Sequence, residues 1–183
     1  MMRGFSTVEL LVVIAVIGLM VAATVPQMQP LVQQLHANTA TSQVLSQLRL
    51  ARQTSIAQRR SIQVQFLGNN EIKFVRNEVP NGQTVVCDLF LDGNVQFLLV
   101  PSMPDTPDGY GNNNPVEFAG LGGGPNVMQF QSDGTFVDGN GNPINGTVFL
   151  GIPNFPSSAR AITVLGTTGR VHSFKTQGTG WIQ

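Results

Sequence analysis

The chain has 183 residues with ten basic and ten acidic side chains, so its formal net charge at pH 7 is zero. It is 42% apolar and only 11% charged, whereas roughly a quarter of an ordinary soluble domain is charged. Zero net charge excludes a generic basic nucleic-acid binder, one cysteine excludes a disulfide scaffold, and the apolar content excludes a disordered chain. The length allows one domain plus an appendage.

Residues 5–25 form an apolar run in which Glu9 is the only charged side chain. A helix of this length measures about 31 Å, close to the bilayer hydrocarbon core of about 30 Å. The run therefore predicts a transmembrane helix that follows a short leader, residues 1–4. Arg3 on the short side favours a cytoplasmic N-terminus, with everything beyond Pro26 across the membrane.

Glu9 is an unfavourable residue in such a segment, because a lone carboxylate there costs on the order of 2.5–3.5 kcal/mol. We therefore expect it to be paired. If the chain were cut after Gly4, Phe5 would carry a free ammonium group four residues before Glu9, on the same helical face. The Phe5 amine of a neighbouring chain could serve equally.

A different interpretation of this run is an ordinary signal peptide, cut after Ala23 in the small-residue stretch 21–23. The rest of the chain would then be a secreted binding domain. Glu9 is an awkward residue for the apolar core of a signal peptide, so this interpretation fits the sequence less well.

Residues 26–60 continue the helix, with Pro26 and Pro30 predicted to kink it where they remove backbone donors. From residue 31 onward the apolar and small side chains recur at a spacing of three to four, as on one face of a helix. They stand at positions 31, 35, 37, 40, 44, 45, 48, 51 and 56.

Four arginines gather late in this helix, at positions 49, 52, 59 and 60, whereas residues 10–70 contain no acidic residue. The simplest interpretation is that these cations complement the negative end of the helix dipole. The functional alternative is a stripe that faces an anion or a partner protein.

Residues 61–183 change to a period of two and predict a β-rich globular domain of short antiparallel strands. The segments 61–66 and 71–76 are predicted to form one hairpin, joined by a turn at Asn69-Asn70. The segments 83–91 and 95–100 are predicted to form a second hairpin. Later strands are predicted around 127–130, 135–137, 146–152, 159–166 and 170–176. Residues 101–126 are too rich in Gly, Pro and Asn for a regular element. The fold class is α+β: a long N-terminal helix followed by an antiparallel sheet or sandwich.

No catalytic motif is present in the sequence. His36 and His172 fall in different elements without ligand-spaced partners, and Cys87 lies in an apolar strand as a predicted buried, inert thiol. The glycine run at 120–124 lacks the Lys-Ser/Thr of a phosphate loop. We expect no enzymatic activity, no cofactor and no metal.

Residues 138–149 begin like a calcium-binding loop, with Asp138, Asn140 and Asn142 at alternate positions. The sixth position is Pro143 instead of glycine, and the twelfth is Phe149 instead of glutamate. An Asn/Gly turn is the simpler interpretation.

The N-terminal residues resemble the class III signal of type IV pilins and type II secretion pseudopilins. Gly4, Phe5, Glu9 and the apolar run carry this resemblance, and Pro26 and Pro30 stand where the family often has a proline. The resemblance implies that a prepilin peptidase cuts after Gly4 and methylates Phe5, and that Glu9 acts in assembly.

The second half resembles the GspH/FimT family of minor pilins and pseudopilins. An Ala-Arg step at residues 51–52 leads into the first strand, a Phe-x-x-x-Gly hairpin follows at Phe130 and Gly134, and a final hairpin carries Gly169-Arg170. The resemblance implies a single-pass bacterial inner-membrane protein with a periplasmic C-terminal domain. Its partners would be other pilins in a filament.

Two filaments fit this resemblance: a type II secretion pseudopilus, which we favour, or a type IV pilus with a FimT-like minor pilin that contacts DNA. Arg170, His172 and Lys175 are the candidate DNA contacts, and Lys175 is expected on the opposite strand face unless a bulge intervenes. DNA-binding members look like Gly-Arg-x-Arg here, whereas this chain has His172 as the second cation. Because histidine is mostly neutral at pH 7.5, we expect DNA binding to be weak at neutral pH.

Overall fold

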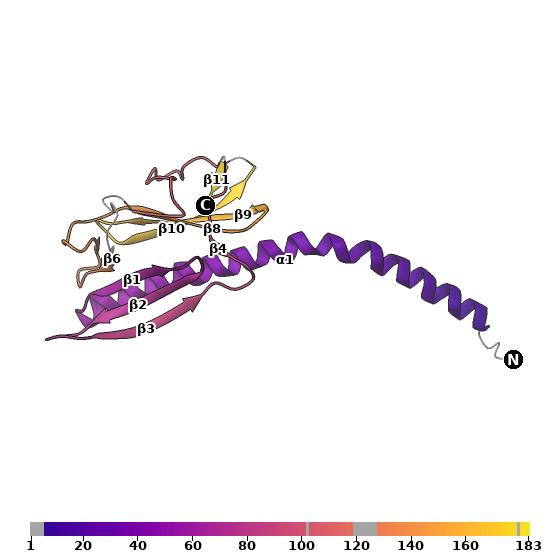
Figure 1. The fold of residues 1–183 in the computed structure, drawn as a ribbon, viewed down its shortest axis with the longest axis horizontal. Coiled ribbons are helices and arrows are strands. Elements are labelled where there is room, and N and C mark those ends of the chain that lie inside the picture. Colours follow the sequence, from indigo (N-terminus) through magenta and orange to yellow (C-terminus); the bar gives the residue numbers. More distant parts are fainter. Residues whose placement is uncertain (1–5, 102, 119–127, 179) are drawn as a thin grey trace.

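The computed structural model describes residues 6–101, 103–118, 128–178 and 180–183. One helix, α1 (Thr7–Gln58), precedes all of the described strands. Its C-terminal half lies against the strands, and its N-terminal half extends away from them with a gentle curve (Figure 1). The strands and the C-terminal half of α1 are called the head below.

Local interactions explain both ends of α1. The helix begins after Ser6, which has an extended backbone, and Glu9 lies in the first turn, where the helix dipole favours an acid. At the other end Arg59 adopts the left-handed conformation with φ 51°. The Arg59 amide donates to the Ile56 carbonyl and the Arg60 amide to the Ser55 carbonyl, as in a Schellman termination.

The kink predicted at Pro26 and Pro30 is not shown. The backbone is helical through both positions, and the helix is one continuous element. Each proline removes one backbone donor, but the hydrogen bonds on either side maintain the helical path with only a smooth bend.

Two antiparallel sheets make up the rest of the head. Sheet A has the order β3-β2-β1-β6-β7, formed by β1 (Ile62–Leu67), β2 (Glu71–Asn77), β3 (Gln83–Phe90), β6 (Met128–Phe130) and β7 (Phe136–Val137). Sheet B has the order β11-β10-β9-β8-β4, formed by β4 (Gln96–Phe97), β8 (Gly146–Ile152), β9 (Phe155–Leu165), β10 (Arg170–Gln177) and β11 (Gly180–Ile182). β5 (Val116–Phe118) pairs with β8 beside this path.

The hairpin predicted between 83–91 and 95–100 is wrong. β3 pairs with β2, whereas β4 crosses to sheet B and pairs with β8. The physical reason is burial: Leu91 and Val95 enter the core between the sheets, which carries the chain across the head instead of back along β3.

Two further strands were not predicted. β5 lies inside the segment 101–126 that the sequence assigns to irregular structure, and β11 follows the last predicted strand. Both strands have only three residues, which is too short for a clear alternating pattern in the sequence. β5 also pairs with β8, about thirty residues further along the chain, whereas β11 pairs with the preceding strand β10. Residues 119–127, including the glycine run at 120–124, lie outside the described residues.

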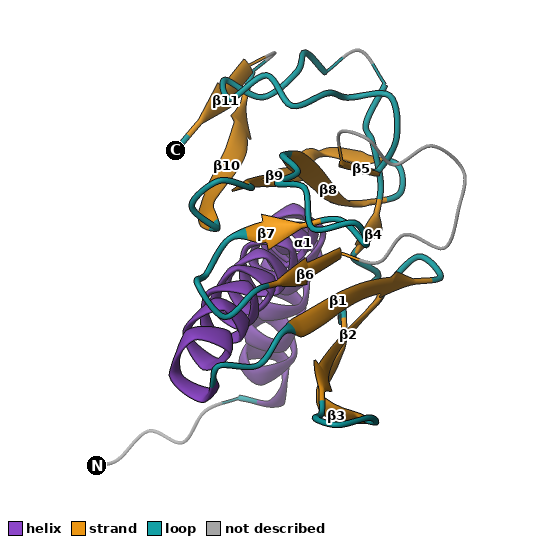
Figure 2. Ribbon diagram, turned by 90° about the vertical axis from the view of Figure 1, so that its left-hand side faces the viewer, coloured by secondary structure: helices purple, strands orange, loops and turns teal. Residues whose placement is uncertain are grey.

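The core lies between α1 and the two sheets (Figure 2). The buried face of the helix repeats every three to four residues and consists of Ala37, Ala40, Thr41, Val44, Leu48, Ala51 and Ser55. It packs against β8, β9 and β10 of sheet B and against β1 and β6 of sheet A. Phe130 and Phe136, on the paired strands β6 and β7 of sheet A, are buried in this core with their ring centroids 4.7 Å apart.

A second, smaller cluster covers the outer face of sheet B. Phe149, Ala161 and Phe174 are buried there, with Leu99 and Trp181 packed on them. The indole nitrogen of Trp181 donates to the Pro104 carbonyl at 2.8 Å. Since β8 is covered on both faces, its residues are buried throughout, as its mainly apolar sequence suggests.

Candidate assembly surface and motif junction

The N-terminal half of α1, which extends away from the strands (Figure 1), exposes apolar side chains on every side. Eleven large apolar residues are between 45% and 73% exposed: Val8, Leu10, Leu11, Val12, Val13, Ile14, Val16, Ile17, Leu19, Met20 and Val21. Glu9 is exposed among them. A helix that is apolar all round is typical of a segment that contacts an apolar environment or other helices on all sides.

Some of the predicted features of this segment are not observed. Gly4 and Phe5, the predicted cleavage and methylation positions, lie outside the described residues. Within the part of the chain that is described, no helix is both long enough and apolar enough to cross a membrane.

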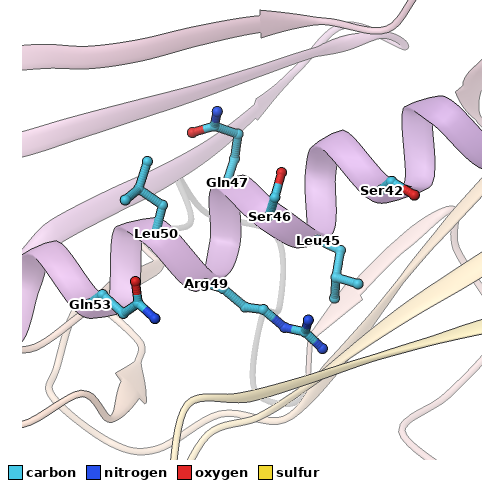
Figure 3. Close-up of a pocket in the computed structure, with 7 residues that line it drawn as sticks. All are labelled: Ser42, Leu45, Ser46, Gln47, Arg49, Leu50 and Gln53. Carbon is cyan, nitrogen blue, oxygen red and sulfur yellow. The ribbon is translucent and has the colours of Figure 1, made fainter.

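A shallow groove of about 490 Å³ continues the exposed surface of α1 into the head. Leu45 and Arg49 point to one side of the helix and Gln47 and Leu50 to the other (Figure 3). The described residues that line it all belong to α1, so this stretch of helix, although docked on the sheets, keeps one accessible face.

The three family motifs of the head meet at Arg52. Its Nε donates to the Gly134 carbonyl at 3.2 Å, which fixes the turn between β6 and β7 against α1. Gly169, in the turn between β9 and β10, lies so close that an added Cβ would be 2.1 Å from the Gly134 oxygen and 2.8 Å from Arg52 Nε. The sequence indicated these motifs separately, and the structure brings them together.

None of the late arginines lies within the last turn of α1, but Arg59 is its C-cap residue and Arg60 follows directly, so their effect on the helix dipole stays a prediction. Arg49 donates from Nη2 to the Val171 carbonyl at 3.3 Å, next to the Arg52 bond. These two side chains hold α1 to the sheets by satisfying backbone acceptors.

The candidate DNA contacts lie on β10. Arg170 is exposed at the start of the strand, and His172 follows it on the same face. The ladder between β10 and β9 runs without a bulge from Arg170 to Lys175, so Lys175 lies on the opposite face as predicted.

His172 is partly covered by the loop that precedes β5. Its Nδ1 lies 3.3 Å from the Asp108 carboxylate, and Thr163 donates a hydrogen bond to the same carboxylate oxygen. The Nε2 atom of His172 is buried without a partner among the described residues. Burial, and secondarily Asp108, raises the pKa of the nearby Tyr110 hydroxyl.

The remaining candidate residues of the sequence analysis have surroundings that give them a role in the fold. The Asp138 carboxylate accepts the amides of Asn140 and Asn142 at 2.9 and 2.8 Å, so it organises a turn. The hydrogen bond from the Asn142 amide is the main reason that the Asp138 pKa lies below its usual value. Cys87 is half-buried at the edge of the core instead of fully buried. His36 packs against Gly93.

The described residues contain no group of three or more His, Cys, Asp or Glu side chains that could hold a metal. Sequence reasoning also missed one polar residue, Arg160 of β9, which is buried beside Asn38 of α1. No motif surrounds it, and its strand reads as apolar.

No protein-family model and no curated protein matches the sequence. Three solved structures have a similar fold. The minor pseudopilin EpsH of the Vibrio cholerae type 2 secretion system is 11% identical with a TM-score of 0.51, covering 76% of this chain and 97% of its own. The type IV minor pilin FimU of Pseudomonas aeruginosa, in two crystal forms, is 14% and 13% identical. Both forms have a TM-score of 0.50 and cover 80% of this chain and 92% and 97% of their own. The chain therefore has the type IV pilin-like fold of minor pseudopilins and minor pilins, which agrees with its resemblance to the GspH/FimT family.

Proposed function

We propose that this chain is a non-enzymatic minor subunit of a pilin-like filament. The observation that supports this most strongly is the N-terminal half of α1, whose apolar side chains are exposed on every side around Glu9. A bundle of like helices would cover this surface completely. The similarity of the fold to a minor pseudopilin and a minor pilin points in the same direction.

In this proposal the apolar run 5–25 is held in the bacterial inner membrane before assembly, with the head in the periplasm. The membrane step rests on the sequence, since part of that run lies outside the described residues. A prepilin peptidase cuts after Gly4 and methylates Phe5. On assembly, the subunit leaves the membrane and helix packing replaces lipid contact.

Glu9 has a specific role in the proposal. A carboxylate enclosed by apolar helices is unfavourable unless it meets an opposite charge. The new ammonium group of Phe5 on a neighbouring subunit would supply that charge. Pairing at this one level would set the register between subunits.

Of the two filaments, the proposal favours the type II secretion pseudopilus. In the alternative, a FimT-like minor pilin with DNA contacts, β10 would offer its cations to phosphates. The contact between His172 and Asp108 instead directs this side chain toward an acid of its own chain. A secreted binding domain is the least favoured alternative, because release after Ala23 would discard most of the apolar surface.

Glu9→Val tests the role of Glu9 in assembly. Valine keeps the segment apolar, so membrane insertion and cleavage should be unchanged. Removing one partner of a buried ion pair costs about 3–5 kcal/mol, and about 1.4 kcal/mol is tenfold, so incorporation into filaments should fall at least about tenfold. Quantitative mass spectrometry measures the incorporation of the variant in sheared filaments, and its insertion and cleavage in membranes.

Leu10→Val is the matched control, because it also places valine in the first turns and leaves the charge in place. It should assemble normally. Normal incorporation of Glu9→Val would reject the proposed pairing of Glu9 with the Phe5 ammonium group. Equal defects in the two variants would show that the loss arises from altered packing and not from the missing charge.

DNA binding separates the two filaments. We expect the full chain to show no measurable affinity for duplex DNA at pH 7.5 by fluorescence anisotropy. The alternative requires binding that strengthens at pH 5.5, where histidine becomes charged, and that weakens in Arg170→Ala. Binding with those two properties would favour the DNA-contacting pilin over the secretion pseudopilin.

A further inference from the structure

Arg160 is a buried cation whose acceptors within the described chain are all neutral. Its residue is 6% exposed, and it lies on β9 facing α1. The guanidinium Nε donates to Asn38 Oδ1 at 2.9 Å, and Nη1 donates to the carbonyls of Ser157 and Ala159 at 3.0 and 2.8 Å. Amide and carbonyl oxygens orient a guanidinium but leave its charge uncompensated.

No carboxylate of the described residues lies within 4.0 Å of this guanidinium. Burial alone lowers the pKa of Arg160, which indicates that the charge is held in an unfavourable environment. The remaining nitrogen, Nη2, has no hydrogen-bond partner among the described residues and is not enclosed. The site therefore keeps unused donor capacity at a nitrogen that retains some accessible surface.

Lys175 of β10 adds a second cation. It is the direct cross-strand partner of Arg160 in the antiparallel ladder between β9 and β10. Directly opposite residues share a sheet face with Cβ atoms about 4.5–5.5 Å apart, and like charges so placed are destabilising. Lys175 is exposed and forms no ion pair with the described residues. A buried cation and an exposed cation thus lie side by side with no acid of the described chain in contact.

We propose that Arg160 and Lys175 form a binding site for a phosphate group. The planar guanidinium can donate to one phosphate oxygen from its free Nη2, while the flexible ammonium of Lys175 reaches another oxygen in a different plane. A tetrahedral phosphate offers oxygens in both directions, whereas a planar carboxylate does not. Binding would neutralise the two charges that the fold places opposite each other.

Two sources can supply this phosphate: dissolved phosphate or a phospholipid headgroup. Asn38, which holds the guanidinium, lies three residues after Leu35, a large exposed apolar side chain of α1. The helix from Thr7 to Leu35 is about 42 Å long, comparable to a bilayer of about 40–45 Å with its headgroups. If that half lies in lipid, the site is level with the headgroups. The geometry of the site itself does not depend on filament assembly.

Isothermal titration of the full chain in phosphate-free maltoside micelles with inorganic phosphate tests the site, with chloride at matched ionic strength as the reference. We expect saturable binding that Lys175→Gln weakens about fivefold and Arg160→Gln at least about tenfold. Arg170→Gln removes one positive charge at the other end of β10 and should leave the affinity unchanged. Because Lys175 is exposed, its variant keeps the test informative if Arg160→Gln fails to fold.

Three results would overturn the proposal: no saturable phosphate binding, equal weakening in Arg170→Gln, or acetate binding as tight as phosphate. The last of these would reassign the site to a carboxylate of a partner protein.

Thermal unfolding then identifies the source of the phosphate. The quantity to compare is the difference in thermal unfolding midpoint between wild type and Lys175→Gln. If this difference increases only with dissolved phosphate, the ligand is a soluble phosphate. If it also increases in phosphatidylglycerol nanodiscs without added phosphate, the ligand is a headgroup. A difference that increases under neither condition contradicts the site.

Discussion

At the scale of single residues, Arg52 shows how the separate motifs of this sequence act together. It links α1 to the turn between β6 and β7 through the Gly134 carbonyl, and Gly169 lies against the same group. The two glycines have positive φ values, 85° and 61°. Glycine is thus favoured at each position by the left-handed backbone conformation. At Gly169 it is also required because two turns and α1 approach so closely that a side chain would not fit.

Gly169→Ala should destabilise the head more than its backbone conformation explains. The left-handed conformation costs about 1–2 kcal/mol for alanine, and the clash with Gly134 and Arg52 should raise the total to about 3 kcal/mol or more. Urea unfolding followed by the fluorescence of Trp181, the only tryptophan in the sequence, measures this loss.

Gly178→Ala is the control, because its φ is 63° and an added Cβ would meet no atom within 4 Å. It should cost only the conformational part. Equal losses of unfolding free energy in the two variants would show that the contact of Gly169 with Gly134 and Arg52 tolerates a side chain. The close approach would then add nothing to stability.

At the scale of elements, α1 has two functionally different halves. The C-terminal half presents one buried stripe to the sheets, and the N-terminal half presents apolar residues in all directions. The sequence predicted both halves, because helical periodicity and apolar content are local properties. It also predicted the hairpins β1–β2, β6–β7 and β9–β10, whose strands are neighbours along the chain.

Pairings between distant segments could not be predicted in this way. The crossing of the chain from β3 to β4 depends on where Leu91 and Val95 find space between the sheets. Strand pattern fixes which face is apolar, but it does not name the partner strand. The same limit applies to Arg160, whose importance arises only when β9 meets Asn38 and Lys175.

Two leucines of α1 test the division of the helix surface. Leu48 is 1% exposed in the core, whereas Leu50 is 51% exposed. Leu48→Ala should lower the unfolding free energy by about 2–5 kcal/mol, because it leaves a cavity. Leu50→Ala should change the unfolding free energy by less than about 0.5 kcal/mol.

Urea unfolding of both variants measures these two changes in unfolding free energy. The variants are matched, because each replaces a leucine of α1 with alanine and the two positions are only two residues apart. If Leu50→Ala were as destabilising as Leu48→Ala, the face of α1 along the groove would be buried in the isolated subunit. That face would then be unavailable to a neighbouring subunit.

At the scale of the whole molecule, the chain joins a self-contained head to a helical segment that extends away from the described strands (Figure 1). The two sheets and the C-terminal half of α1 bury a common core, so the head is complete as a folded unit. Within the described residues, the N-terminal half contributes to no such core, and in the proposed function other molecules cover its apolar surface. This asymmetry is the physical basis of the proposed filament subunit.

The cleavage signal at Gly4 and Phe5 stays a prediction from the sequence, because those residues lie outside the described structure. The candidate DNA contacts could be placed on one strand from sequence, and the register confirmed which face each occupies. The contact of His172 with Asp108 could not be predicted, since the loop that carries Asp108 has no regular pattern.

The central claim is tested most directly by mass spectrometry of filaments purified from the native organism, reading both the presence of this chain and its N-terminal peptide. The account predicts that the chain is found in the filaments and begins with a methylated Phe5. A chain that begins at Thr24 and is absent from the filaments would contradict it, and would identify a secreted domain instead.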